Sequence, residues 1–440
     1  MLPDEYDDGF GATPDRPTPS RHRLPPRLAG SLHDRRARWA AVTLTCLAVG
    51  GLLVHAALGQ HGAASTATTA RSLPMPAPAP LVRMGKSWPS TGASCGTDRF
   101  LPIVTADPLR VPTGVRIEVG GQTVHTVDVD ARSVSSPETV NLPANEFVSQ
   151  LVVSGGASYA LVQPCESTDT GAVFRVTAQG SALLLASNRH IDGLFPDGHG
   201  GVWAAEVADI ATDGPVVLVQ LPGSGVVRLP AGLQPVAVSG HRVIAMTQNS
   251  AESHGSASGS LVTYDLTSRR LGPSLGRASS LTASAGVLLW TEGPCSAAAP
   301  CILHRYDLAT GASSVRGYSL PVEASVTGGV ISPDRRRLAF ALPREFDDRH
   351  VDTAGFGPPL DLVMLDLGTG VLEGIPGVEL PPTAPAGLTF SADSAWLVIA
   401  LNEGASTRLL LWRPGLSRPL RAGVEVAGPM LQAPPVVPAP

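Results

Sequence analysis

A short apolar segment recurs along this 440-residue chain. Neighbouring copies are roughly 41–47 residues apart, with one gap near 60, which is the spacing expected of a four-stranded propeller blade. The period therefore constrains the fold of most of the chain. It leaves the function open, because propellers support many unrelated functions. The clear copies are residues 261–266 (LVTYDL), 302–308 (ILHRYDL) and 362–367 (LVMLDL), and the looser ones are residues 173–176, 216–221 and 409–412.

Strands and turns can be placed within one repeat. Residues 329–332 and 338–342 are predicted strands on either side of a Pro-Asp turn at residues 333–334, where proline fixes φ and aspartate can bond to the following backbone. A long loop leads to a third strand, residues 362–367, and a fourth follows at residues 371–372. Four short antiparallel strands per unit, with almost no helical periodicity, predict an all-β propeller of six to seven four-stranded blades.

The blade count depends on which structure the segment before the repeats forms. Six units are visible between residues 150 and 423. Residues 114–119 and 123–129 alternate apolar and polar side chains around a Gly-Gly turn, which predicts a hairpin. We expect residues 100–148 either to form a seventh blade or to close the ring.

Some repeats carry a more specific motif. Residues 332–340 (SPDRRRLAF) and 390–398 (FSADSAWLV) resemble the repeats of TolB-like propellers, also called WD40-like or PD40 repeats. Residues 195–203 (FPDGHGGVW) are a weaker third case. The resemblance covers residues 150–423 and implies a bacterial propeller in which an Asp-containing turn joins the first two strands of a blade. Family members mostly bind proteins, and some propellers carry enzyme sites. Two repeats lack the Pro-Asp turn, which also leaves the blade count open.

Residues 39–58 contain no charged side chain. About 20 residues rising 1.5 Å each just span a hydrocarbon core of about 30 Å, so this segment is a predicted transmembrane helix. Seven arginines lie between residues 16 and 38, whereas the first basic residue after the segment is Arg71, which predicts a cytoplasmic N-terminus. The alternative is a cleaved signal peptide, with a cleavage-like site at residues 54–56. A lipoprotein is excluded because Cys46 lies inside the apolar run.

The chain thus divides into five expected parts. Residues 1–38, acidic and then rich in proline and arginine, are an expected disordered cytoplasmic tail. After the transmembrane helix at residues 39–58, residues 59–93 form an expected Pro/Ala-rich stalk. Residues 94–425 form the extracytoplasmic propeller, and residues 426–440 are expected to be a Pro-rich disordered C-terminal tail. The expected location is the cell membrane, with a single pass. The formal net charge of −5 argues against a general nucleic-acid surface.

Four cysteines lie outside the apolar segment: Cys95, Cys165, Cys295 and Cys301. An even number in an exported domain indicates disulfide bonds. Cys295 and Cys301 bracket a short loop between two predicted strands, so a local bridge is feasible. Cys165 ends the equivalent strand of another repeat, whose return strand has no cysteine, and we therefore predict a Cys165–Cys95 bond. The alternative is inert free thiols. No Cys-x-x-Cys pair is present, so no metal site is predicted.

Other residues could carry chemistry. Residues 272–276 match Gly-x-Ser-x-Gly, but no helix follows, as a nucleophile elbow requires. His190, His199 and His241 could line a central channel, where a histidine and Asp197 could act as acid and base. The better interpretation is that they are polar turn residues that satisfy backbone groups. Four tryptophans in predicted strands could stack on sugars, although packing between blades is the better interpretation: Trp203, Trp290, Trp396 and Trp412.

The longest loop between strands, residues 343–359, is highly charged. Its carboxylates and one histidine could bind a cation, but no fixed ligand geometry is evident. A solvated loop is the better interpretation, and long loops are where propellers vary their binding. We therefore expect partner contacts at its charged residues: Glu345, Asp347, Asp348, Arg349, His350 and Asp352.

The sequence favours a binding function. We expect a non-enzymatic binding or scaffold module at the bacterial cell envelope, anchored in the membrane, with another envelope protein or a glycan as its partner. No catalytic residue, cofactor or metal is predicted. One alternative is an envelope hydrolase or lyase with its site at one mouth of the ring. The other is a single-pass sensor that signals through the cytoplasmic tail.

Overall fold

In the computed structural model, the described residues all lie within one compact unit, Ala79–Pro440. The residues that it describes are 102–135, 146–164, 170–177, 180–207, 215–248, 259–293, 301–320, 324–343, 360–380, 386–403, 406–427 and 434–440. No helix in these ranges is long and apolar enough to cross a membrane. The predicted tail, transmembrane segment and stalk lie outside the described residues and stay predictions.

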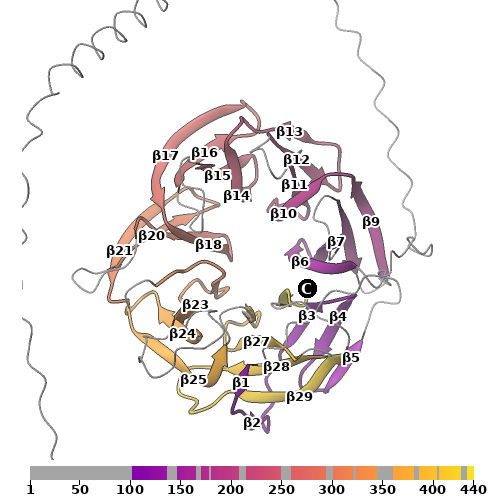
Figure 1. Cartoon of the computed structure of the whole chain (residues 1–440), viewed down its shortest axis with the longest axis vertical. Coiled ribbons are helices and arrows are strands. Elements are labelled where there is room, and N and C mark those ends of the chain that lie inside the picture. The colour runs from indigo at the N-terminus through magenta and orange to yellow at the C-terminus, as the bar shows by residue number, and fades with distance from the viewer. Residues whose placement is uncertain are drawn as a thin grey trace, which may run out of the picture. The chain divides into compact units, whose positions relative to one another are not determined.

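The described strands form seven sheets arranged in a ring, which confirms the predicted propeller (Figure 1). Each of the first six blades contains four antiparallel strands that follow one another along the chain, with the first strand nearest the centre of the ring. We number these blades 1 to 6 in chain order and call the seventh the closing blade.

The strands of the first three blades have the following bounds. Blade 1 contains β6 (Glu146–Ser154), β7 (Ala157–Pro164), β8 (Gly171–Thr177) and β9 (Gly180–Ser187). Blade 2 contains β10 (His190–Pro196), β11 (Val202–Val207), β12 (Val216–Leu221) and β13 (Val226–Arg228). Blade 3 contains β14 (Leu233–Ser239), β15 (Arg242–Gln248), β16 (Gly259–Asp265) and β17 (Arg270–Ala278).

The next three blades continue the pattern. Blade 4 contains β18 (Ser280–Ser284), β19 (Val287–Thr291), β20 (Cys301–Asp307) and β21 (Ser313–Tyr318). Blade 5 contains β22 (Val330–Ile331), β23 (Arg337–Pro343), β24 (Leu360–Asp366) and β25 (Leu372–Leu380). Blade 6 contains β26 (Gly387–Phe390), β27 (Leu397–Asn402), β28 (Ser406–Trp412) and β29 (Leu420–Ala427).

The closing blade combines both ends of the described unit. Its order is β30 (Val436–Pro438), β3 (Arg116–Gly120), β4 (Val124–Asp128) and β5 (Ser133–Ser135). The predicted hairpin is β3 and β4, and Val119 pairs with Val436 of β30. The expectation of a disordered tail over residues 426–440 is therefore wrong for β30. Proline composition suggested a tail, but Pro438 ends an innermost strand that has a neighbour on one side only, where a missing N–H is tolerated.

The segment before the closing blade covers two outer edges. β1 (Ile103–Val104) pairs antiparallel with β25, and β2 (Asp107–Pro108) pairs parallel with β29. Blades 5 and 6 therefore have five strands each. Covering an edge strand removes a row of unpaired backbone groups.

The recurrent sequence segments are the third strands of blades 1 to 6, as predicted: β8, β12, β16, β20, β24 and β28. They are apolar because each packs against two neighbouring blades. In β28, Leu409 and Leu411 pack toward the closing blade, whereas Leu410 and Trp412 pack toward blade 5. Packing between blades also holds the strand tryptophans, as predicted, since all four are buried: Trp203, Trp290, Trp396 and Trp412.

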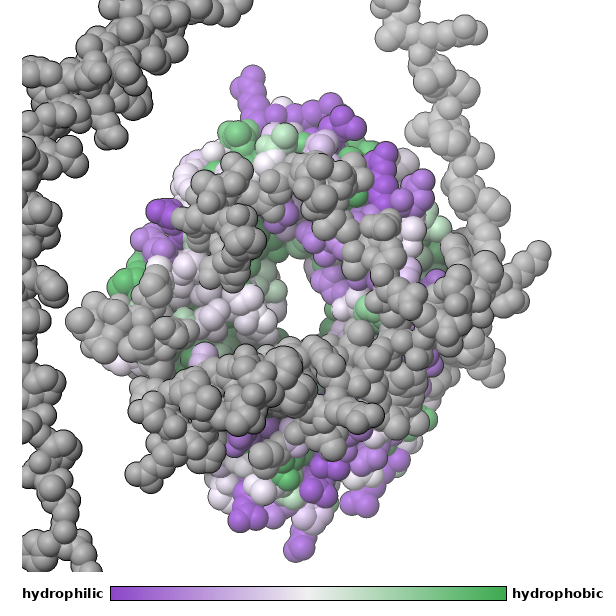
Figure 2. Space-filling model, viewed as in Figure 1, coloured by the Kyte–Doolittle hydropathy of each residue, from purple (hydrophilic) through white to green (hydrophobic). Residues whose placement is uncertain are grey.

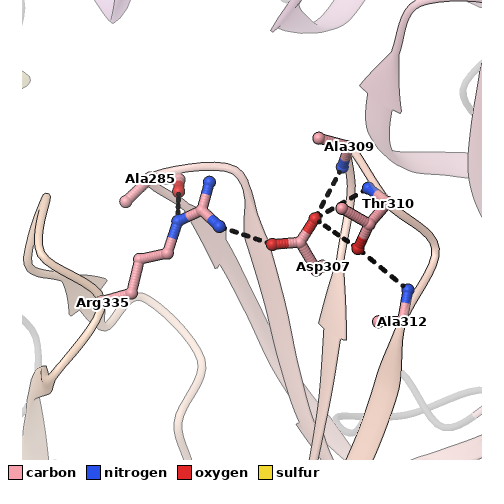
Figure 3. Close-up of polar contacts among 6 residues, drawn as sticks. All are labelled: Ala285, Asp307, Ala309, Thr310, Ala312 and Arg335. Atoms are coloured by element: carbon pink, nitrogen blue, oxygen red, sulfur yellow. Dashed lines mark hydrogen bonds and ion pairs between the residues drawn. The ribbon is translucent and has the colours of Figure 1, made fainter.

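The aspartate of the clear repeats organises the turn after the third strand. In blade 4, Asp307 Oδ1 accepts hydrogen bonds from the backbone N of Thr310 (2.8 Å) and of Ala309 (3.1 Å). Its other oxygen pairs with Arg335 of blade 5, whose Nε also donates to the carbonyl of Ala285 (Figure 3). Asp366 caps the equivalent turn of blade 5 by accepting from Gly368 and Thr369.

Candidate functional site

A cavity of about 730 Å³ lies against the innermost strands of four neighbouring blades. Figure 2 shows that the ring is hollowed at its centre, where these innermost strands lie. The lining comes from β6 and β7, β10, β14 and β15, β18, and the segment just before β22. Its residues are Ser149, Gln150, Leu161, Gln163, Asp192, Gly193, Phe195, Gln234, Pro235, Val236, Met246, Ser279, Ser280, Leu281, Ser325 and Thr327.

Three β-bulges shape this cavity. In blade 1, Val148 and Gln150 pair with consecutive residues of β7, so Ser149 is an extra residue. The same irregularity makes Asp192 the extra residue of β10 and Val236 that of β14. A bulge leaves its extra residue unpaired in the ladder and redirects the side chain. All three extra residues line the cavity.

The bulged residues were missed from the sequence, although a signal is present. Buried positions in a one-sided strand should recur every two residues. Here the buried residues Val148 and Leu151 are three apart, and so are Ile191 and Leu194. A gap of three in an otherwise alternating strand indicates an inserted residue.

The cavity lies toward the end of the ring at which first strands begin and second strands end. Gln163 is close to the end of β7, and Met246 close to the end of β15. The connections between second and third strands start from this end. One of them is the predicted contact loop, which joins β23 at Pro343 to β24 at Leu360. Its six charged residues, from Glu345 to Asp352, lie outside the described residues, so their role stays a prediction.

Side-chain amides tie blade 1 to blade 2 beside the cavity. The Gln150 amide accepts from Leu194 N (2.7 Å) and donates to Leu194 O (3.1 Å). Gln163 Nε2 donates to Ile191 O (2.9 Å). The positions equivalent to Gln150, just after each bulge, are Gly193 in β10 and Ala237 in β14. Neither can form such a tie, which leaves room between the inner strands of blades 2, 3 and 4.

Among the described residues of the lining, Asp192 is the only one with an ionisable side chain, and none is an arginine, lysine or histidine. Its Oδ1 lies 3.8 Å from Nε2 of His190, at the start of β10. The rest of the lining supplies hydroxyl and amide groups and apolar surface. The described lining is therefore rich in groups that can donate and accept hydrogen bonds.

Two of the four serines in the described lining have a hydroxyl partner. Ser279 Oγ and Ser280 Oγ each lie 2.9 Å from Thr291 Oγ1. A serine nucleophile needs an adjacent base, usually a histidine. A hydroxyl cluster of this kind does not provide one.

Two of the three histidines that could have lined the channel lie elsewhere, in polar turns, which confirms the better interpretation for them. His199 and His241 are in turns between the first and second strands of blades 2 and 3, at the other end of those strands. Asp197 accepts hydrogen bonds from the backbone N of His199 (2.7 Å) and of Gly201 (2.9 Å), and His241 pairs with Asp265 at 3.3 Å. These are the polar turn roles that the sequence favoured. His190 alone approaches the cavity.

The Gly-x-Ser-x-Gly segment is part of β17, the outer strand of blade 3, and is not followed by a helix. Ser274 Oγ donates to the carbonyl of Leu261 (3.3 Å). The segment is therefore not a nucleophile elbow, as the sequence indicated.

The cysteine predictions stay open. Cys301 is buried at the start of β20 and forms a disulfide bond. The other three predicted cysteines lie outside the described residues, so neither Cys295–Cys301 nor Cys95–Cys165 is tested. Among the residues that the structure describes, no group of three potential metal-ligand side chains occurs.

Comparisons with known proteins find similarity of fold only. No family model matches the chain, and no curated protein matches it. TolB from Acinetobacter baumannii is 14% identical, with a TM-score of 0.40 over 77% of this chain and 81% of that chain. A putative 6-phosphogluconolactonase from Bacteroides fragilis is 11% identical, with a TM-score of 0.46 over 75% and 99%. Apo AztD from Citrobacter koseri is 11% identical, with a TM-score of 0.45 over 73% and 97%. Nothing about function follows from similarity at this level.

Proposed function

We propose that this protein is a membrane-anchored binding or scaffold module of the bacterial cell envelope, which binds an envelope protein or a glycan. The observation that carries the proposal is the central cavity, where bulges in three neighbouring inner strands place Ser149, Asp192 and Val236 in the lining. A concave site with a few convergent polar groups is the usual form of a ligand site. Its volume of about 730 Å³ lies in the range of such sites.

The same cavity favours binding over catalysis. An enzyme site brings together ionisable groups whose environments set their protonation for proton transfer. Within the described lining, Asp192 is the only ionisable residue, and Ser279 and Ser280 contact the Thr291 hydroxyl. The His190–Asp192 pair is the nearest approach to an acid–base pair among the described residues here, and its separation of 3.8 Å is longer than a hydrogen bond.

The envelope location rests on sequence features. The uncharged segment at residues 39–58 and the arginines before it support a single pass with the propeller outside. Fractionation of cells that produce the chain, followed by protease treatment of spheroplasts, tests this part. Digestion of the propeller from outside agrees with the proposal, and full protection contradicts it.

Crosslinking on intact cells tests the binding function. Val236→Trp and Ser149→Phe each fill the cavity, and Val315→Trp is the matched control, since Val315 is 60% exposed on the outer strand β21. We expect wild type and V315W to recover the same specific partner in equal amounts. Both cavity variants should recover at least about tenfold less of that partner, which corresponds to a loss of about 1.4 kcal/mol in binding free energy. Equal recovery from variants with unchanged unfolding midpoints would contradict the proposal.

A further inference from the structure

The central cavity also indicates which class of ligand it binds, an inference that rests on the proposed function. Charge is the first criterion. Asp192 is the only charged residue among the sixteen that line the cavity. An anionic ligand would be repelled by this exposed carboxylate, and none of the described lining residues is positively charged to offset that repulsion.

The interrupted inner edges are the second criterion. A peptide that binds as an added strand needs a continuous row of backbone groups along a sheet edge. The innermost strands β6, β10 and β14 are the channel-facing edges of their blades. A bulge interrupts each of them at the cavity, at Ser149, Asp192 and Val236. Strand addition is therefore blocked where the cavity is formed.

The polar groups are the third criterion. Each bulge leaves backbone donors and acceptors outside the ladder. They lie on three blades around the cavity and are supplemented by the Gln234 amide and the Thr327 hydroxyl. Separated donors and acceptors around an uncharged space match a ligand with hydroxyl groups on several sides. A carboxylate such as that of Asp192 can accept hydrogen bonds from two neighbouring hydroxyls.

The fourth criterion is an apolar wall in the same cavity. The half-buried ring of Phe195 lines it with Pro235 and Leu281. Gly193 lies beside this ring, where a Cβ would be in ordinary contact with it, 3.5 Å from Phe195 Cζ. Sugar rings combine hydroxyl edges with C–H faces that pack on an aromatic ring. We propose that the cavity binds an uncharged saccharide unit of a glycan, with Asp192 accepting hydrogen bonds from its hydroxyls and Phe195 packing on its ring.

Calorimetric titration of the full-length protein tests this proposal, in a detergent without a sugar headgroup. The neutral probes are maltotriose, cellotriose, mannotriose and chitotriose, and trigalacturonic acid is the anionic probe of matched length. We expect at least one neutral probe to bind, and the anionic probe to bind at least about tenfold more weakly. Asp192→Asn should weaken the neutral probe by about tenfold, since hydrogen bonds to a charged group are the stronger ones. Phe195→Ala should weaken it as well.

Asp107→Asn is the control, because Asp107 is an exposed carboxylate on β2 at the outer edge of blade 6, and it should change affinity less than twofold. Failure of all four neutral probes, tighter binding of the anionic probe, or full affinity in a folded D192N protein would each overturn the proposal. If Val236→Trp still abolished recovery of a partner from cells, only the ligand class would be wrong. If that partner were recovered equally well by V236W, the proposed function would fail too.

Discussion

At the scale of single residues, aspartates stabilise the turns that follow the third strands. Asp265, Asp307 and Asp366 end equivalent third strands, and each accepts backbone hydrogen bonds from the turn that follows. Those bonds are the largest cause that holds the pKa of each carboxyl below its ordinary value. The Tyr-Asp-Leu signature in the sequence is thus a strand followed by its own turn cap.

Removing one of these caps should destabilise the protein. Asp307→Ala loses the bonds from Ala309 and Thr310 and the ion pair with Arg335, which joins blade 4 to blade 5. We expect a loss of about 1–2 kcal/mol in the free energy of unfolding, measured by urea denaturation at pH 7. Asp107→Ala is the control, since its exposed pair with Arg418 at 4.0 Å contributes little. Equal effects of the two substitutions would contradict the turn-cap role.

The same cap predicts a pH dependence. The carboxyl of Asp307 has a lowered pKa in the folded state, so it stabilises the fold above the unfolded-state pKa of about 3.9. That contribution is lost as the pH falls through the folded-state pKa. The difference in stability between wild type and Asp307→Asn should therefore shrink as the pH is lowered below about 4. A constant difference between pH 7 and pH 2 would contradict this.

Glu118 on β3 should behave in the opposite way. The side chain is buried, Oε2 has no hydrogen-bond partner, and burial raises its pKa more than the nearby Ser158 hydroxyl lowers it. The folded state then holds its proton more tightly than the unfolded state, so the ionised group costs stability as the pH rises above about 4.3. Glu118→Gln should raise the free energy of unfolding by about 1 kcal/mol at pH 7 and by little at pH 3. A loss of stability at pH 7 would show that the carboxylate has a partner.

At the scale of strands and blades, much of the architecture could be predicted. Third strands recur visibly because each is buried between two blades and has to be apolar, as Leu409 and Leu410 illustrate. The Pro-Asp turns were equally readable. The cavity could not be predicted in this way, because a bulge redirects the side chain of Asp192 without changing the amino-acid composition of β10. The role of Val436 was also hidden, since three residues that pair with a segment over 300 positions earlier leave no local pattern.

A glycine at the start of blade 6 tests close packing between elements. A Cβ on Gly387 would overlap the carbonyl oxygen of Pro434, just before β30. Gly387→Ala should therefore lower the free energy of unfolding by about 2 kcal/mol, since overpacking forces backbone shifts. Gly374→Ala in blade 5 is the control, because its Cβ would meet nothing within 4 Å. Similar thermal midpoints for the two variants would mean that β30 adjusts freely.

At the scale of the whole propeller, the ring is held by joining its two ends. β30 supplies the innermost strand of the closing blade, and Val436 packs in the cluster shared with blade 6. On the outside, β1 and β2 attach the start of the described unit to blades 5 and 6. Closure therefore depends on residues from both ends of one unit.

Removing residues 434–440 should weaken this closure. The deletion takes away the three pairs between β30 and β3 and the buried side chain of Val436. We expect a loss of at least about 2 kcal/mol in unfolding free energy, from lost apolar burial and hydrogen bonds. Hydrogen exchange should rise first in β3 and β26, which flank the missing strand. Deletion of Pro440 alone is the control, and unchanged exchange in the longer deletion would mean that the ring closes without β30.

The central claim is that this propeller binds its partner at the bulged inner strands. A photoreactive amino acid placed at position 236 in intact cells tests it most directly, with position 315 on the outer strand β21 as the comparison. We predict that irradiation links a specific envelope protein or glycan to position 236 and not to position 315. Crosslinks from position 315 but none from position 236, in a protein with an unchanged unfolding midpoint, would contradict the claim.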